Sequence, residues 1–216
     1  MEMNRHYFES PEYSLDDLIR DDIAKHFVPE QDSLTKVIGT GADTIKIVKN
    51  FMPEKDVEII MGKMNFMYGQ GERRTFNPNV VDSKVLEYVK KVKEKSESLF
   101  NVDMDYDEYA SPSTNFDSYL AGRMPNFVTA VHSDNLDIDK GKYQEYNWSG
   151  HVSNLIYLND DYVGGELFFP YHNLKIKPEM GMLISFPGHW WNRHGILPAS
   201  SMRFAMSVFF KIKNFE

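Results

Sequence analysis

The sequence predicts a mainly β domain, a sandwich or jelly roll with flanking helices, and two observations support this fold class. After residue 110 the chain consists of short runs rich in Phe, Tyr, Val and Ile, separated by turns that contain Gly, Pro or Asn-Asp. Before residue 100, two segments instead place their apolar residues at helical spacing. Many short strands with intervening turn signals are typical of antiparallel sandwiches and jelly rolls.

The elements are expected in the following order. Residues 44–51 alternate apolar and polar, as a half-buried strand does. Pro53 suits the first turn of a helix that we expect to run to about Met67. Valines at helical spacing predict a second amphipathic helix over roughly residues 80–99. We expect both helices to cover one face of the larger sheet.

The second half of the chain is expected to hold the strands. The predicted strands are Phe116–Leu120, Phe127–His132, Val152–Leu158, Glu166–Phe169, Leu174–Lys177, Met182–Phe186, Trp190–His194 and Arg203–Lys211. The polar segment Asn135–Gly150 is predicted to be a loop at the mouth of the barrel. Residues 1–43 are taken as an N-terminal extension, and residues 44–216 as one domain, because the length of the chain suits a single domain.

Composition and charge narrow the function. The chain has no cysteine, which excludes disulfides, zinc–thiolate sites, iron–sulfur clusters and a cysteine nucleophile. The net charge of -8 disfavours a nucleic-acid partner, since phosphate binding needs a basic surface. Neither a signal-peptide pattern nor an apolar run of membrane-spanning length is present. We therefore expect a cytoplasmic protein that does not bind membranes, and its oligomeric state stays open.

A candidate metal site combines His132, Asp134 and His194. Alternate residues of a strand point to one side, so His132 and Asp134 can both reach one metal. His194, which lies 60 residues after Asp134, can supply a third ligand from a distant strand. Two imidazoles and one carboxylate on one face of an octahedron leave three positions for a bidentate keto acid and O₂, as in non-haem Fe(II) oxygenases. A His-x-Asp pair is common by chance, and taken alone it would be read as a surface His near an Asp. His194 also has rivals for the third position, namely His151, His172 and His189.

Arg203, nine residues after His194, is a candidate anion anchor. The strand pattern that starts at Arg203 puts Ser207 on the same face, where its hydroxyl could donate a further hydrogen bond. An arginine pointing into a barrel would be an uncompensated buried charge, and a bound dicarboxylate would resolve this through two parallel hydrogen bonds. The alternatives are an Arg203 paired with a buried carboxylate, or one exposed at a strand end.

Together these motifs resemble the 2-oxoglutarate/Fe(II) dioxygenase superfamily, and within it the prolyl 4-hydroxylase-like branch, over roughly residues 45–212. The resemblance rests on these segments: Ile47–Pro53, His132-Ser133-Asp134, Ile156–Asp160, Gly164–Leu167, Lys177-Pro178, Gly181–Phe186, His194-Gly195 and Arg203. It implies a double-stranded β-helix (a jelly roll, cupin-like) with the N-terminal α-helices packed on the major sheet.

The resemblance also implies the site and its chemistry. Fe(II) would be held by His132, Asp134 and His194, and the far carboxylate of the cosubstrate 2-oxoglutarate would meet Arg203. Hydroxyl groups that help to hold this carboxylate or line its pocket in relatives match three further positions: Tyr157, Ser207 and, more loosely, Tyr119. The implied reaction uses O₂ to hydroxylate a prolyl residue of a peptide or protein and releases succinate and CO₂, with ascorbate as a candidate reductant.

Other functions remain open at this point. The same iron chemistry could act on a free amino acid, another side chain or a nucleobase, although the acidic charge disfavours the last. A cupin-like protein could instead bind a small ligand without turnover. A structural β-sandwich whose His and Arg residues coincide by chance is the remaining alternative.

Overall fold

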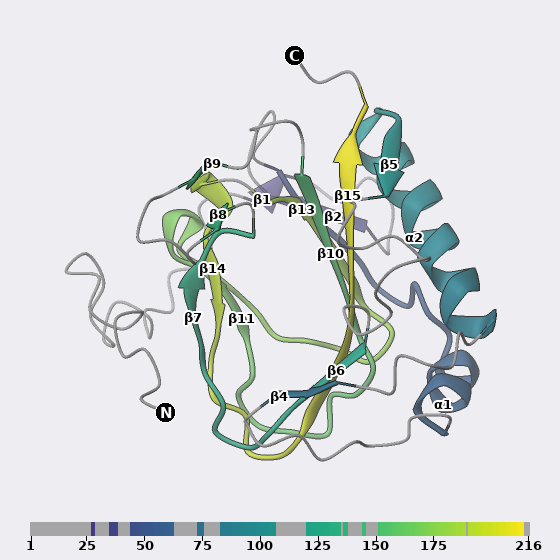
Figure 1. Cartoon of the computed structure of the whole chain (residues 1–216). Coiled ribbons are helices and arrows are strands. Elements are labelled where there is room, and N and C mark those ends of the chain that lie inside the picture. The colour runs from purple at the N-terminus through teal and green to yellow at the C-terminus, as the bar shows by residue number, and fades with distance from the viewer. Residues whose placement is uncertain are drawn as a thin grey trace.

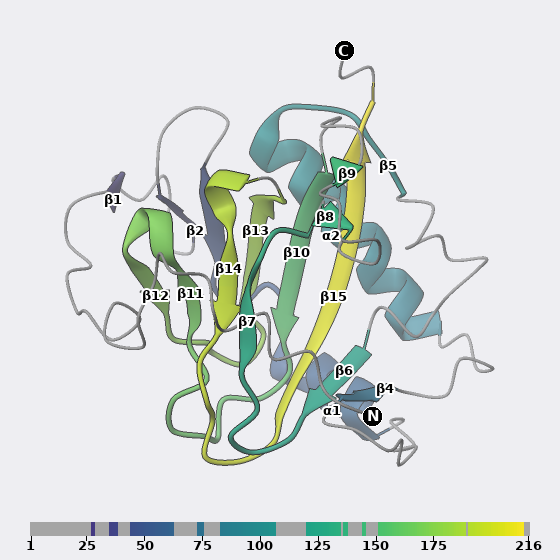
Figure 2. The ribbon, with the colours of Figure 1, turned by 60° about the vertical axis from the view of Figure 1, so that its left-hand side comes forward.

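Two antiparallel sheets face each other in this protein, and two helices lie against the outside of the larger sheet (Figure 1 and Figure 2). A computed structural model describes residues 27–28, 35–38, 44–62, 73–75, 83–106, 120–134, 136–137, 144–145, 151–188 and 190–213. This arrangement confirms the predicted fold class, a double-stranded β-helix with α-helices packed on the major sheet.

The helices are α1 (Glu54–Gly62) and α2 (Ser83–Phe100), with short 3-10 helices η5 (Pro170–His172) and η6 (Trp190–Asn192). The strands before the metal-site region are β1 (Phe27–Val28), β2 (Thr35–Ile38), β3 (Ile45–Val48), β4 (Arg73–Thr75), β5 (Met104–Tyr106) and β6 (Leu120–Arg123). The later strands are β7 (Thr129–His132), β8 (Leu136–Asp137), β9 (Gln144–Glu145), β10 (His151–Tyr157), β11 (Leu167–Phe169), β12 (Leu174–Ile176), β13 (Leu183–Pro187), β14 (His194–Ile196) and β15 (Arg203–Ile212).

The larger sheet runs in the order β1-β2-β3-β13-β10-β15-β6-β4, and β5 adds to β15. The smaller sheet has the order β12-β11-β14-β7, while β8 and β9 pair with each other. β10 and β15 lie near the centre of the larger sheet and are paired along seven residues, from His151↔Lys211 to Tyr157↔Ala205. Because successive strand residues point to opposite faces, this register decides which side chains enter the space between the sheets.

One hydrophobic cluster fills the space between the two sheets. It includes Ile184 and Phe186 of β13, Tyr157 of β10 and Phe169 of β11, and all four side chains are buried. Such a core excludes water from the interior, where polar groups then interact strongly.

A second hydrophobic cluster lies between the outer face of the larger sheet and the helices. Val85, Val89 and Val92 of α2 pack there against β10 and β15, as their helical spacing predicts. A buried hydrogen bond crosses this layer from α2 to β10, where the Ser96 hydroxyl donates to the Asn154 side chain at 2.6 Å. Figure 2 shows the helices on this side of the sheet, away from β7 and β14.

The structure differs from the expected elements in several places. The predicted strand Trp190–His194 is instead η6 followed by β14, because the buried Asn192 side chain donates a 2.9 Å hydrogen bond to the Pro187 carbonyl and closes a turn. β6 begins at Leu120, where the predicted strand ends, and α1 is described only as far as Gly62. The strands β2, β4 and β5 were not predicted, because each is too short for a clear alternation pattern.

Two further predictions concern the ends and the loops. β1 and β2 fall within the predicted extension 1–43, where β1 pairs with β2 and β2 pairs with β3, while most of that extension lies outside the described residues. The predicted loop 135–150 contains the short pair β8–β9, and the rest of it is also outside the described residues. In the described part of the chain, no helix combines the length and apolar character that crossing a membrane requires.

Candidate metal centre

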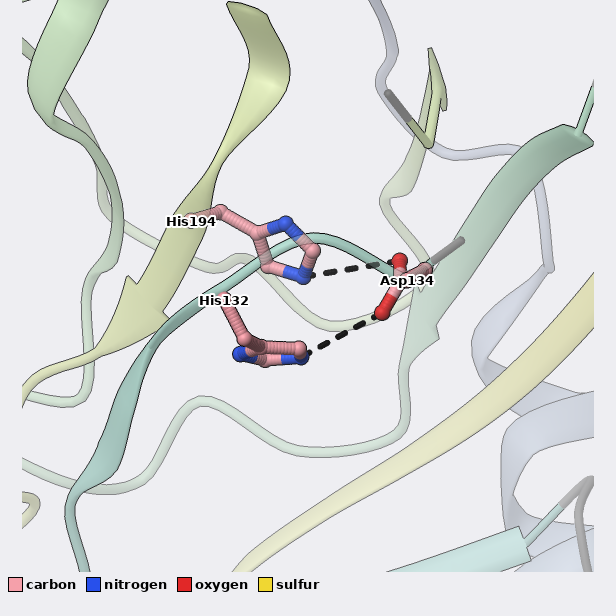
Figure 3. A group of neighbouring side chains, drawn as sticks. All are labelled: His132, Asp134 and His194. Atoms are coloured by element: carbon pink, nitrogen blue, oxygen red, sulfur yellow. Dashed lines mark ion pairs between the residues drawn. The ribbon is translucent and has the colours of Figure 1, made fainter. Parts of the chain in front are cut away.

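Three side chains from two neighbouring strands converge at one end of the smaller sheet. His132 ends β7 and His194 begins β14, and the two residues are direct partners in the antiparallel pair. Asp134 follows His132 by two residues and turns its carboxylate toward both imidazoles (Figure 3). His132 Nε2 lies 3.2 Å from Asp134 Oδ1, and His194 Nε2 lies 3.6 Å from Asp134 Oδ2. The fold thus joins residues that are far apart in the sequence.

The arrangement fits a divalent metal. One ligand atom of each residue lies within 4.8 Å of the other two. Ligand atoms that occupy one face of an octahedron, each about 2.1 Å from the ion, are separated from one another by about 3 Å. Small rotations of the side chains would bring the three atoms to that spacing. A donor set of two imidazoles and one carboxylate is the one that non-haem Fe(II) uses, with three positions left open.

Backbone carbonyl groups orient both imidazoles for this role. His132 Nδ1 lies 2.8 Å from the Ala130 carbonyl oxygen, and His194 Nδ1 lies 3.1 Å from the Asn192 carbonyl oxygen. With the proton on Nδ1 donated to the carbonyl, each ring keeps its Nε2 lone pair for a metal. Such second contacts fix the tautomer and raise the basicity of a metal-binding histidine.

A buried serine holds the carboxylate. The Ser153 hydroxyl, on the inner face of β10, donates a 2.5 Å hydrogen bond to Asp134 Oδ2. This contact links the smaller sheet, which carries the two histidines, to the larger one. Aromatic rings surround His194, with the Phe186 and Phe169 centroids at 4.8 and 5.6 Å from that of the imidazole. The ligands therefore lie in an ordered and largely apolar environment.

The two histidines differ in their affinity for protons. Burial lowers the pKa of His132, but the hydrogen bond to Asp134, the negative charge of Asp134 and the hydrogen bond to the Ala130 carbonyl together outweigh it, so the pKa is raised above its ordinary value. Burial lowers the pKa of His194 to about 4. His194 is thus neutral at neutral pH and ready to bind a cation, whereas His132 must compete with a proton that Asp134 favours.

Deeper between the sheets lies a buried arginine. Arg203 begins β15, is only 4% exposed, and its Nη1 atom has no hydrogen-bond partner among the described residues. Its guanidinium lies 5.7 Å from the ring centroid of Tyr157, whose hydroxyl is also buried and has no hydrogen-bond partner in the described part of the chain. Burial raises the pKa of the Tyr157 phenol, so it stays a neutral donor. Unpaired buried donors are costly, and together they suit an anionic ligand.

These donors lie on the inner face of the larger sheet, the face that also carries Ser153, further along the strands. Tyr157 is opposite Ala205, two residues from Arg203, and four residues beyond Ser153 on β10. Four residues of strand span about 13 Å. An anion held by Arg203 would therefore lie within the interior, further along β10 than the Ser153 that contacts Asp134.

The remaining predicted residues have less definite places. Ser207 lies on the inner face opposite Leu155 and is half-buried. Tyr119 lies outside the described residues. Of the alternative histidine ligands, His172 forms a 2.7 Å hydrogen bond with Asn192 and is not part of the metal cluster.

Sequence reasoning missed Ser153 and Asn192, which position the candidate ligands, and the buried Tyr162, which lies in the connection between β10 and β11. Ser153 could have been found, because the alternation of β10 places it on the same face as Tyr157. Asn192 and Tyr162 lie in connections without a periodic pattern, so their contacts depend on how the loops fold.

Comparison with known proteins gives a consistent result. Residues 117–211 match the family model described as "2OG-Fe(II) oxygenase superfamily". Prolyl 3-hydroxylase 3 of Mus musculus and that of Homo sapiens are each 37% identical over 82 residues, a stretch that covers 31% of this chain and 10% of each relative. The chain thus spans only about a tenth of the length of the curated relatives it matches.

Solved structures of similar fold include two prolyl hydroxylases. A viral collagen prolyl hydroxylase from Paramecium Bursaria Chlorella virus-1, in complex with 2-oxoglutarate, matches with a TM-score of 0.54 and 18% identity, covering 77% of this chain and 94% of that one. A Pseudomonas putida prolyl-4-hydroxylase matches with a TM-score of 0.50 and 17% identity, covering 77% and 91%. HygX from Streptomyces hygroscopicus, solved with nickel, 2-oxoglutarate and hygromycin B, has a TM-score of 0.56 at 9% identity, covering 80% and 84%. At these identities the likeness is one of fold.

Proposed function

We propose, from the premise that this chain belongs to the 2OG-Fe(II) oxygenase superfamily, that it hydroxylates a prolyl residue in a peptide or protein. The chain is a 2-oxoglutarate- and Fe(II)-dependent oxygenase with a candidate iron-binding triad. The observation that carries the proposal is the convergence of His132, Asp134 and His194 on the same interior as the buried, incompletely paired Arg203.

Different residues of the chain would bind the metal and orient the cosubstrate. When bound together, Fe(II) and 2-oxoglutarate supply the chemistry that activates O₂ and hydroxylates a C–H bond, with release of succinate and CO₂. The triad would hold Fe(II) and leave three positions free on one side. Arg203 and Tyr157 would orient 2-oxoglutarate through its far carboxylate, and Phe169 and Phe186 keep water from His194.

An exposed aromatic pair supports the choice of a peptide substrate. Tyr171 of η5 and Trp191 of η6 are 37% and 54% exposed, and their ring centroids lie 5.8 Å apart in an edge-to-face contact. Trp191 precedes the ligand His194 by three residues, so the pair lies beside the metal end of the smaller sheet. Exposed aromatic rings at such a place suit the apolar ring of a prolyl residue. The names of the curated relatives, both prolyl 3-hydroxylases, favour the same substrate class.

A second candidate is the same chemistry on a small molecule. HygX, a protein of similar fold, was solved with hygromycin B, which is the specific observation in its favour. The two candidate functions predict different products. A prolyl substrate would yield a peptide that carries one additional oxygen atom, whereas a small-molecule substrate would leave every peptide unchanged.

The test combines turnover with product analysis. The protein, loaded with Fe(II), is incubated with 2-oxoglutarate, O₂, ascorbate and a panel of proline-containing peptides, and succinate and the mass of each peptide are measured. We expect succinate release that depends on the peptide, together with a mass gain of one oxygen atom at proline. His132→Ala and Arg203→Ala should each abolish this turnover. Lys211→Ala, an exposed change on the same strand as Arg203, should retain it.

The outcomes separate the alternatives. Full turnover in both the His132 and the Arg203 variants would rule out the site. Succinate release without any oxidised peptide would direct the search to small molecules. Binding of 2-oxoglutarate without succinate release under any condition would favour a non-catalytic binding protein.

A further inference from the structure

Tyr162 is a buried tyrosine that the proposed site leaves unexplained. It lies in the connection between β10 and β11, is only 6% exposed, and its hydroxyl has no hydrogen-bond partner in the described part of the chain. A buried hydroxyl without a partner is costly, so natural proteins seldom leave one without a reason. A ligand that accepts its hydrogen bond would be such a reason.

Two other buried donors belong to the strands that flank the connection carrying Tyr162. Tyr157 ends β10 just before this connection, and Arg203 begins β15 just after residues 198–200, to which the connection is hydrogen-bonded. Burial raises the pKa of the Tyr162 phenol, the neighbouring Tyr157 raises it further, and the Arg203 guanidinium lowers it. Tyr157 Oη and Arg203 Nη1 are themselves buried without hydrogen-bond partners among the described residues. Three incompletely paired donors, one of them cationic, thus lie on chain segments that meet at the same end of the larger sheet, on the side away from Ser153.

The loops at this end hold the Tyr162 ring in place. The β10–β11 connection is joined to the β14–β15 connection by hydrogen bonds of 2.8 Å from Gly165 N to Pro198 O and 2.9 Å from Ser200 N to Val163 O. Gly165 has a φ of +73°, and a Cβ atom there would lie 2.7 Å from Tyr162 Cε2. The ring therefore packs directly on a glycine that no other residue could replace without displacing it.

A lysine completes this support. Lys177 Nζ lies 4.7 Å from the centroid of the Tyr162 ring and donates 2.8 Å hydrogen bonds to the carbonyl oxygens of Tyr162 and Gly164. The backbone and the ring face of Tyr162 are thus occupied, whereas its hydroxyl is not. A side chain fixed in this way is ready to bind a ligand with little further loss of entropy.

We propose that the Tyr162 hydroxyl donates a hydrogen bond to the far carboxylate of 2-oxoglutarate, as an additional anchor beside Arg203 and Tyr157. This inference rests on the proposed function. A carboxylate offers about four lone-pair positions on its two oxygens. A guanidinium bound through two parallel hydrogen bonds uses two of them, and the two phenol hydroxyls match the others. Tyr162 is accordingly a specificity residue for a dicarboxylic keto acid over one without the far carboxylate.

The test measures equilibrium binding without turnover. Mn(II)-loaded protein is titrated anaerobically by calorimetry with 2-oxoglutarate, and separately with oxalate, which chelates a metal but has no far carboxylate. Tyr162→Phe should weaken 2-oxoglutarate binding about tenfold, the usual effect of one hydrogen bond to a charged group. Oxalate binding should be unchanged. Tyr106→Phe, whose ring packs against Phe210 on the outer side of the sheet, is the matched control and should bind both ligands like the wild type.

Three results would overturn the inference about Tyr162. An unchanged Kd for 2-oxoglutarate in Tyr162→Phe, with wild-type binding intact, overturns the role of Tyr162 and leaves the proposed function standing. Equal weakening of oxalate also overturns it, because the change would then act on the metal site or on the fold. A wild-type protein that binds Mn(II) but no 2-oxoglutarate overturns the proposed function, and the inference with it.

Discussion

At the scale of single residues, the most informative contacts are the hydrogen bonds that orient the candidate metal ligands. Asp134 is oriented by Ser153, and the two imidazoles are oriented by backbone carbonyls. Only the serine can be removed by mutation without changing a ligand. Its hydrogen bond therefore offers a direct measure of how far the protein preorganises the metal site.

We predict that Ser153→Ala lowers the affinity for Mn(II) or Fe(II) by about 10- to 100-fold, because Asp134 loses the donor that fixes its carboxylate. Metal titration followed by electron paramagnetic resonance measures this. Ser185→Ala is the matched control, since its hydroxyl donates to Asn154 on the outer side of the same sheet. That variant should lose about 1 kcal/mol of stability and retain its metal affinity. Equal metal affinities in the two variants would contradict the role of Ser153.

At the scale of elements, the 3-10 helices η5 and η6 connect the surface to the metal site. On the outside, Tyr171 contacts Trp191. On the inside, the buried Asn192 bonds to His172 and to the Pro187 carbonyl, and its own carbonyl oxygen lies 3.1 Å from His194 Nδ1. Asn192 is thus a positioning residue, which would act on the metal through His194.

We predict that Asn192→Ala weakens metal binding by about tenfold or more, because the turn that presents its carbonyl to His194 loses both side-chain hydrogen bonds. Leaving their buried partners unpaired should also cost about 1–3 kcal/mol of stability. Trp191→Ala removes only the exposed ring and should keep wild-type metal affinity while raising the KM for a peptide substrate. Calorimetric metal titration of both variants, with steady-state kinetics of the second, checks the pair of expectations.

The carboxylate of Asp56 links α1 to α2. Asp56 accepts a 2.6 Å hydrogen bond from the Tyr88 hydroxyl and lies 2.9 Å from Lys84 Nζ. The bond from Tyr88 and that from Lys84 lower the pKa of Asp56. A carboxylate whose pKa is lowered by folding stabilises the native state above its unfolded pKa of about 3.9, and this contribution is lost as the pH falls through the folded value.

We therefore predict that Asp56→Asn lowers the melting temperature at pH 7, and that the difference from the wild type shrinks as the pH falls below about 4. Thermal unfolding followed by circular dichroism across this pH range would show it. Glu58→Gln, an exposed change in the same helix, should have little effect at any pH. A difference for Asp56→Asn that stays constant with pH would mean that its charge does not matter.

At the scale of the whole molecule, the site joins the two sheets, so ligands should stabilise the entire domain. The triad lies at one end of the smaller sheet, while Arg203, Tyr157 and Ser153 belong to the larger one. A ligand that bridges the two groups binds only the folded chain. Its binding free energy must then appear as stability.

We predict that saturating Mn(II) and 2-oxoglutarate, each at about 100 times its Kd, add about 2.7 kcal/mol apiece and raise the melting temperature by roughly 5–10 °C for each ligand. In Arg203→Ala, the increase in melting temperature caused by 2-oxoglutarate should be lost, and the increase caused by the metal should remain. Differential scanning calorimetry with each ligand alone and with both separates the two. If 2-oxoglutarate still raised the melting temperature of Arg203→Ala, the role of Arg203 as its anchor would be contradicted.

Much of this architecture could be predicted from local patterns. The alternation of β10 and β15, the valine spacing of α2 and the turn residues between strands are local properties, so the fold class followed from them. The motif around His132, the distant His194 and Arg203 nine residues after it supported the resemblance to 2OG-Fe(II) oxygenases, whose family model matches residues 117–211. The exact bounds were less certain, as η6 in place of a strand illustrates, because a turn closed by one buried Asn192 leaves no periodic pattern.

By itself, the sequence determined the strand-rich fold, the resemblance to 2OG-Fe(II) oxygenases and the chemistry that a His-x-Asp motif with a distant His and Arg can support. Only the tertiary structure decided that His194 rather than His172 joins the cluster and that Ser153 holds Asp134. It also left the buried Tyr162 hydroxyl without a hydrogen-bond partner among the described residues. The physical reason is that periodicity reports which face a residue occupies, whereas the partner it meets depends on register and on loops that bring distant segments together.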